Sequence, residues 1–67
     1  MIEYKTKAGN VWGLVGKCVY GSGWIAEVLL QTGEAFSISG GWPRQYEAVN
    51  QLRQSKPAWA KLEDGEQ

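Results

Sequence analysis

The chain has 67 residues, 43% of them hydrophobic, and its seven basic side chains balance seven acidic ones. This length and composition exclude a disordered chain and predict one small domain, near the lower size limit for folding without disulfides or metals. Neutral charge argues against sequence-independent nucleic-acid binding, because such binding needs many cations to neutralise phosphates.

The first 39 residues predict an antiparallel β-meander. A turn signal at residues 6–10 separates two extended pieces, and glycine-containing turns follow at residues 21–23 and 32–33. Short connections of this kind favour antiparallel pairing of consecutive strands. After the first turn, the predicted strands cover residues 11–20, 24–30 and 34–39.

Aromatic residues are spread over these strands. Trp24 and Phe36 lie on the alternating apolar faces of their strands, and this pattern predicts that both rings belong to the core. Trp12 stays open between core and surface, because glycines interrupt its strand. Cys18, the only cysteine, is expected to be a buried apolar side chain and not a reactive thiol.

A helix is predicted over residues 43–54, after a Gly-Gly-Trp-Pro segment at residues 40–43 that breaks the strand pattern. Proline suits the first turn of a helix, since its φ is already helical. Tyr46, Val49 and Leu52 then recur at helical spacing, so we expect them to lie on the sheet.

The predicted helix stops before Pro57, because a residue that precedes proline resists the helical region. Residues 57–62 predict a short fourth strand or a docked segment that Trp59 fixes, and residues 63–67 predict a frayed acidic tail. The expected fold is therefore a single α+β domain over residues 1–67. It has a three- or four-stranded antiparallel meander with one helix packed on one face.

Signatures of catalysis are lacking in the sequence. It has no histidine, one cysteine and no glycine-rich phosphate-binding motif. Two glutamates on neighbouring predicted strands, Glu27 and Glu34, are expected to belong to a solvated face. We therefore expect no enzymatic activity, no cofactor and no metal site.

The compartment is expected to be the cytoplasm. A single cysteine excludes an internal disulfide, and the N-terminus has no apolar signal segment. No apolar run approaches the length of a membrane span, so no membrane association is expected.

Trp42 is the leading candidate for contact with a partner. Two interpretations stay open: a staple that closes the core against the following helix, or an exposed anchor that acts with Arg44 at a protein interface. The further candidate partner-binding residues are Trp12, Tyr20, Arg53 and Lys56.

The order of three short strands and one helix resembles two groups of proteins. One is the DNA-binding arm domain of phage-type integrases, whose pattern is similar to the segment from Trp24 through Phe36 and the helix around Tyr46. That resemblance implies DNA recognition through the sheet. The chain also resembles small phage-encoded modulators, including anti-CRISPR proteins and inhibitors of host RNA polymerase, in size, architecture and lack of catalytic residues. That second resemblance implies that the chain blocks the surface of a host protein.

The expected function is that of a non-enzymatic binding protein, encoded by a phage or mobile element, that inhibits a host protein or complex. The alternative is a small nucleic-acid-binding module that uses the sheet face. A third interpretation is self-association through Ile25 and Leu29, so both monomer and dimer stay open.

Overall fold

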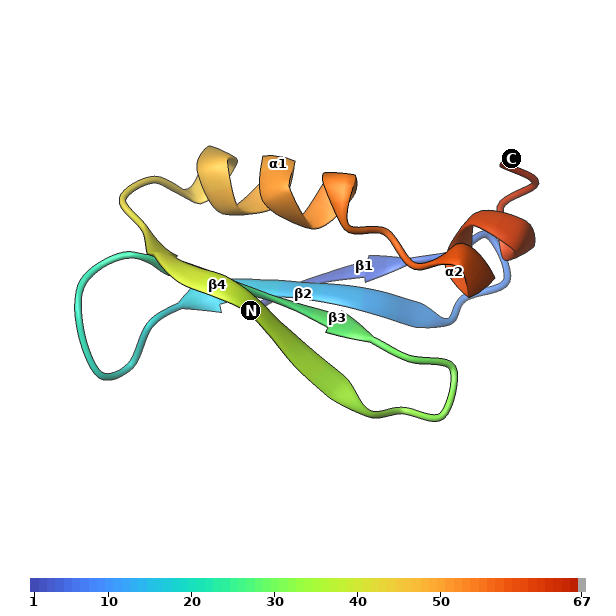
Figure 1. Cartoon of the computed structure of the whole chain (residues 1–67), viewed down its shortest axis with the longest axis horizontal. Coiled ribbons are helices and arrows are strands. Elements are labelled where there is room, and N and C mark those ends of the chain that lie inside the picture. The colour runs from blue at the N-terminus through green and yellow to red at the C-terminus, as the bar shows by residue number, and fades with distance from the viewer. Residues whose placement is uncertain (67) are drawn as a thin grey trace.

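The computed structural model describes residues 1–66, with residues 39 and 40 described in their backbone only. Four strands are followed by two helices, an α+β fold (Figure 1). Their bounds are β1 (Ile2–Lys5), β2 (Val11–Lys17), β3 (Trp24–Leu29), β4 (Ala35–Trp42), α1 (Gln45–Gln54) and α2 (Ala58–Glu63).

The four strands form one antiparallel sheet in the order β1-β2-β3-β4, which confirms the predicted meander. Gly9 and Gly33 adopt positive φ values of 90° and 96° in the turns before β2 and β4. Glycine reaches this region without steric cost, so the sequence directs both turns locally.

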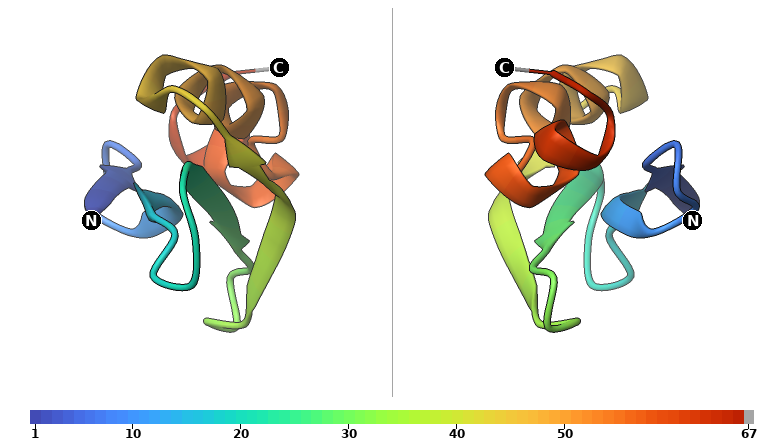
Figure 2. Two further views of the ribbon diagram at one scale, coloured as in Figure 1. Left: turned by 90° about the vertical axis from the view of Figure 1, so that its left-hand side faces the viewer. Right: turned by 90° about the vertical axis from the view of Figure 1, so that its right-hand side faces the viewer.

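The core lies between one face of the sheet and α1, and Figure 2 shows the helix above that face. Val15 and Ala26 of the sheet are fully buried, as are Ala48 and Leu52 of α1. A Cβ atom on Gly13 would lie 2.8 Å from Cδ2 of Leu52. Glycine in β2 thus allows the helix to approach the sheet closely.

A β-bulge places Trp12 in this core. Tyr4 pairs with Gly13 and Lys5 pairs with Val11, so Trp12 has no partner on β1. Its side chain is only 5% exposed, and its ring centroid lies 5.9 Å from that of Tyr4. A bulge re-aims a side chain in this way, and the ambiguity over Trp12 is resolved in favour of the core.

Phe36 corrects a prediction of the sequence pattern. It lies opposite Val28 on the face that α1 covers, as expected, yet it is 54% exposed. The reason is its position near the start of an edge strand, which has a neighbouring strand on one side only. Trp24, by contrast, is partly buried and packs against the core, as predicted.

Several element boundaries differ from those predicted. β2 ends at Lys17, and Tyr20 lies in the following loop. β4 continues past the two glycines to Trp42, which pairs with Trp24 of β3 beyond an irregularity in the ladder. The helix begins at Gln45 and not at residue 43, since Arg44 adopts an extended conformation (φ −126°, ψ 148°).

The segment after Pro57 is helix α2 and not a fourth strand. The carbonyl oxygen of Pro57 accepts hydrogen bonds from the backbone N–H groups of Ala60 and Lys61, and Ala60 is fully buried. The frayed tail is also wrong over residues 63–66, because Glu63, Asp64 and Glu66 all accept side-chain or backbone hydrogen bonds. The last residue of that predicted tail, Gln67, lies outside the described residues.

Candidate binding surface

One end of the sheet gathers aromatic and cationic side chains, some exposed and some partly buried. β2 ends there, β3 begins there, and β4 ends there and leads into α1. This aromatic end, on the left of Figure 1, includes the loop over residues 18–23 and the segment over residues 43–46. The residues that define it are Lys17, Tyr20, Trp24, Trp42, Arg44 and Tyr46.

Backbone pairing sets the positions at the base of the aromatic end. Lys17 pairs with Trp24, which in turn pairs with Trp42, so the three residues form one row across the sheet. The Lys17 Nζ atom lies 5.8 Å from the ring centroid of Trp24, within the range of a cation–π interaction. Trp42 is partly buried and packs against the core, as a staple would.

The loop over residues 18–23 is held at its two ends. The backbone N–H of Cys18 donates a hydrogen bond of 3.0 Å to the carbonyl oxygen of Gly23. Gly23 has a φ of 108°, and a Cβ atom there would lie 2.9 Å from the carbonyl oxygen of Trp42. A side chain at this position would therefore disturb both the loop and the end of β4.

The tips of the aromatic end are strongly exposed. Tyr20 is 97% exposed at the loop, Tyr46 is 62% exposed on the first turn of α1, and the Arg44 side chain between strand and helix is also exposed. The exposure of Tyr46 was not predicted, because its helical spacing with Val49 and Leu52 indicated that it lies on the sheet. Ala48 and Leu52 form the buried face of α1, and Tyr46 lies about half a turn before Ala48, so its side chain points away from the sheet.

Three of the predicted partner-binding residues thus lie at one end of the molecule: Trp42, Arg44 and Tyr20. The others are elsewhere. Trp12 is buried in the core, which corrects its interpretation as a surface contact. Arg53 is exposed, but it lies in the last turn of α1, at the opposite end of that helix.

Lys56 corrects a further expectation, because it is engaged within the chain. Its Nζ donates to Oδ2 of Asp64 at 2.6 Å and also to Glu66, and it lies 5.4 Å from the Trp12 ring centroid. Hydrogen bonds to Asp64 and Glu66 raise the pKa of Lys56. The hydrogen bond from Lys56, with a second from the backbone N–H of Lys7, lowers the pKa of Asp64. These contacts occupy the Lys56 ammonium group.

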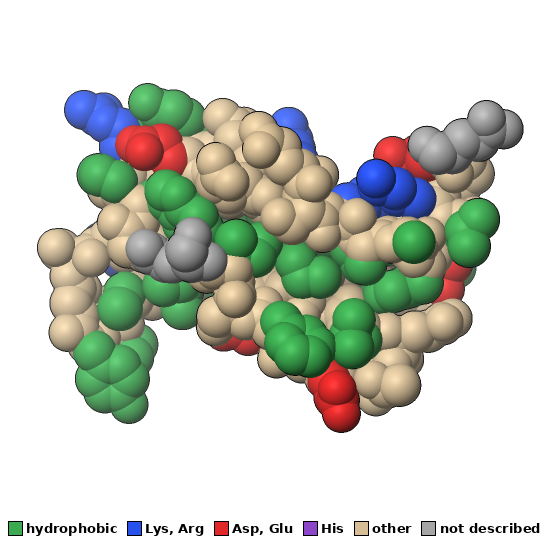
Figure 3. All heavy atoms as spheres, in the orientation of Figure 1, with side chains coloured by type: hydrophobic (Ala, Val, Ile, Leu, Met, Phe, Trp, Pro, Cys, Tyr) green, Lys and Arg blue, Asp and Glu red, His purple; other side chains and the backbone are tan. Residues whose placement is uncertain are grey.

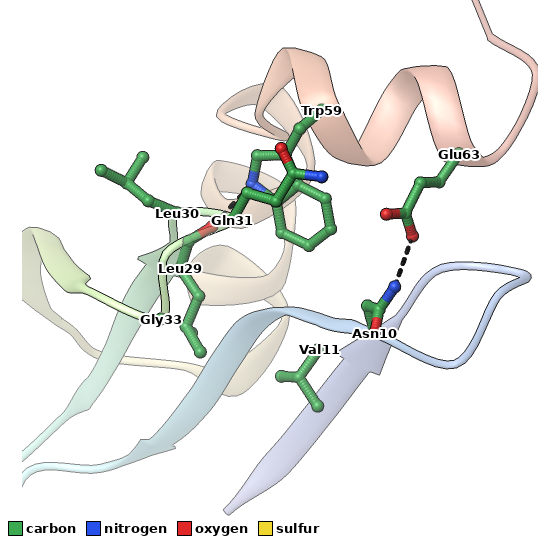
Figure 4. A pocket seen from close by; sticks show the side chains of 8 residues that line it. All are labelled: Asn10, Val11, Leu29, Leu30, Gln31, Gly33, Trp59 and Glu63. Carbon is green, nitrogen blue, oxygen red and sulfur yellow. Dashed lines mark hydrogen bonds between the residues drawn. The ribbon is translucent and has the colours of Figure 1, made fainter.

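A depression of about 210 Å³ lies at the opposite end of the sheet, between α2 and the turns that precede β2 and β4 (Figure 4). Its polar groups are already used by the protein. The indole N–H of Trp59 donates to the carbonyl oxygen of Leu29 at 3.0 Å. Oε1 of Glu63 accepts from Thr6 Oγ1 at 2.7 Å and from Asn10 Nδ2 at 2.9 Å. The depression therefore lies where hydrogen bonds attach α2 to the sheet and its turns.

Within residues 1–66, no group of three or more Cys, Asp or Glu side chains is placed to hold a metal ion. Across the same residues, neither helix has the length and apolar character needed to cross a membrane. Comparisons of the chain with models of protein families, with curated proteins and with solved structures give no match.

Proposed function

We propose that the protein is a non-enzymatic binding protein that attaches to another protein through its aromatic end and blocks the surface it covers. The observation that carries this proposal is the exposure of Tyr20, Arg44 and Tyr46 in segments at the same end of the sheet. Tyrosine and arginine are enriched among the residues that dominate binding energy at protein interfaces. Burial of these rings by a partner would remove apolar surface that the isolated chain leaves in water.

The side chains at the tips are free to bind. For Tyr20, Arg44 and Tyr46, no side-chain hydrogen bond or ion pair is formed with any other described residue. A partner with a carboxylate opposite Arg44 and an apolar patch opposite the tyrosines would match them. The loop that carries Tyr20 is pinned at Cys18 and Gly23, which lowers the entropy lost on binding.

We extend the proposal to the biological setting. The partner is a host protein or complex, and the chain is the product of a phage or mobile element that acts in the cytoplasm. A small domain without histidine or a phosphate-binding motif suits inhibition by occlusion, because occlusion needs surface complementarity and no reacting group.

The rival function, nucleic-acid binding through the sheet, receives less support from the open face. Glu3, Leu14, Glu27 and Ser37 form a row across the side opposite α1, which puts two carboxylates there. The neighbouring Lys5 Nζ lies 4.0 Å from a carboxylate oxygen of Glu3. Carboxylates repel phosphates, so this face suits a nucleic acid poorly.

The test is capture of a partner from host lysate by the wild type and by two matched pairs of variants. Tyr20→Ala is compared with Leu62→Ala, which truncates another exposed side chain, on α2. Arg44→Ala is compared with Arg53→Ala at the far end of α1. We expect Tyr20→Ala and Arg44→Ala to lose the partner, each weakening affinity at least tenfold, and their controls to retain it. Equal capture by all four folded variants would contradict the proposal. Binding of DNA or RNA at low salt would support the rival function instead.

A further inference from the structure

The two edges of the sheet differ in length and charge. β1 has four residues, two of which are Glu3 and Lys5, and a bulge interrupts its pairing with β2. β4 has eight residues, Ala-Phe-Ser-Ile-Ser-Gly-Gly-Trp, with no charged side chain and no proline. The β1 edge thus carries three of the features by which proteins prevent unwanted strand pairing, namely short length, charged side chains and a bulge, whereas the β4 edge is longer and carries no charge.

Among residues 1–66, no strand lies beside the outer edge of β4. Its ladder is formed with β3 only, and α1 lies above a face of the sheet, where it does not shield the edge (Figure 2). β4 runs along the side of the molecule that faces the viewer in Figure 3, where uncharged and hydrophobic side chains predominate over the strand. Alternate N–H and C=O groups of β4 therefore point outward, ready to accept another strand.

The regular part of β4 also presents apolar side chains beside that edge. Its residues 35–38 pair without interruption with β3, and the irregularity lies beyond them. Phe36 and Ile38 share the face covered by α1, yet Phe36 is more than half exposed. A strand added at this edge would cover the Phe36 ring.

We propose that the added strand is β4 of a second copy of this chain, which pairs antiparallel to form a continuous eight-stranded sheet. The strand is self-complementary about a twofold axis at Ser37. In that register Phe36 lies opposite Ile38 of the other copy, so that each exposed ring gains an apolar cross-strand neighbour. Ser37 lies opposite itself, and Glu34 lies opposite residue 40, so no like charges oppose one another.

This assembly has a geometric consequence for the binding surface. Because the paired strands are antiparallel, the end of β4 in one copy lies beside the start of β4 in the other. The two aromatic ends then point in opposite directions along the sheet, and both remain open. The dimer presents two copies of the same surface, as an isologous twofold assembly requires.

Sedimentation equilibrium of the full chain over a range of concentrations tests the proposal. The wild type should show twice the mass of one chain, and Ser37→Lys should shift the mass to that of one chain, because it puts two ammonium groups at the twofold axis. Ser55→Lys, which changes an exposed serine after α1, should keep the dimer mass. A wild type that stays monomeric at millimolar concentration, or a Ser37→Lys variant that stays dimeric, would overturn the proposal.

A cross-link tests the register independently of stability. In a Cys18→Ser background, Ser37→Cys should form an intermolecular disulfide on oxidation, because the two cysteines would meet across the axis. Ser55→Cys in the same background is the matched control and should stay largely uncross-linked. Equal cross-linking at the two positions would contradict pairing through β4. Neither measurement requires the aromatic end to bind a partner, so the outcome for the dimer is separate from that of partner capture.

Discussion

The two ends of the sheet are built in opposite ways. Opposite the aromatic end lies a latched end, formed by the turns over residues 6–10 and 30–34 together with residues 56–66. Every side-chain hydrogen bond found among the described residues lies at the latched end. The aromatic end has none, and it is held by strand pairing and by the core contacts of Trp24 and Trp42.

The difference follows from what each end has to attach. Helix α2 has six residues and a single fully buried side chain, Ala60, so apolar packing alone gives it little stability. Directional bonds from Thr6, Asn10 and Lys56 supply the attachment. The aromatic end grows directly from the sheet and needs no such bonds. Its exposed side chains are therefore available to a partner, whereas the polar groups of the latched end are already used.

The largest expected effect on stability comes from a substitution in the core, which both ends of the sheet share. Leu52→Ala should lower the free energy of unfolding by about 2–5 kcal/mol, because it deletes a fully buried side chain over Gly13 and leaves a cavity. A loss of this size approaches the whole stability of a small domain. Urea unfolding measures it, with Leu62→Ala, 76% exposed, as the control that should change stability by less than about 0.5 kcal/mol. A similar small effect for both variants would place the core elsewhere.

The next largest effect on stability is expected from a substitution that weakens the latched end alone. Glu63→Ala should cost about 1–3 kcal/mol, because the buried hydroxyl of Thr6 loses its acceptor. Hydrogen exchange should then speed up in the turn over residues 6–10 and in α2, and it should stay unchanged at the aromatic end. Glu34→Ala, an exposed glutamate in the neighbouring turn, serves as the control. Uniform acceleration along the chain would mean that the two ends do not open independently.

A smaller effect of pH should also act on the latched end. The pKa of Asp64 lies below its ordinary value of 3.8, so its contribution is present above that pH and is lost as the pH falls through the lowered pKa. The pKa of Lys56 lies above 10.5, so its contribution is present below that pH and is lost as the pH rises through the raised pKa. Stability should therefore change little from these groups between about pH 4 and pH 10.

Asp64→Asn provides the measurement for this pH dependence. The difference in free energy of unfolding between the wild type and this variant should shrink as the solution is made acidic enough to protonate Asp64. Glu34→Gln removes an exposed carboxylate from a neighbouring turn and should not reproduce this loss of difference. A difference that stays constant while Asp64 becomes protonated would show that the ion pair with Lys56 does not stabilise the fold.

The smallest effect on stability is expected at the aromatic end. Tyr20→Ala should change the free energy of unfolding by less than about 0.5 kcal/mol, because the side chain is almost fully exposed. Its effect on partner affinity should be the larger one. Thermal unfolding and partner binding measured on the same sample separate the two quantities. A loss of stability above about 1 kcal/mol would mean that Tyr20 belongs to the fold and not to a free surface.

Sequence patterns were sufficient to predict the central strands and the first helix, but they were insufficient to predict which side chains lie on the surface. The alternation of apolar residues in β3 correctly predicted that Trp24 lies on the core face. The position of Pro57 correctly predicted that α1 ends before it. Tyr46 was misplaced because Ala48 and Leu52, one turn apart, form the buried face of α1, and Tyr46 lies about half a turn before Ala48. The α2 segment is too short for periodicity to distinguish a helix from a strand.

The meander and its following helix are encoded locally, through turn glycines and apolar alternation whose effects reach only a few residues along the chain. Tertiary structure decided the rest. The bulge buries Trp12, the edge position exposes Phe36, and Glu63 accepts a hydrogen bond from Thr6, 57 positions away in the chain. Each of the four tryptophans has a small neighbour in the sequence, Gly or Ala. They differ in burial and in strand pairing, because both depend on contacts between distant segments. No local pattern contains those contacts, since they exist only once the sheet and both helices have come together.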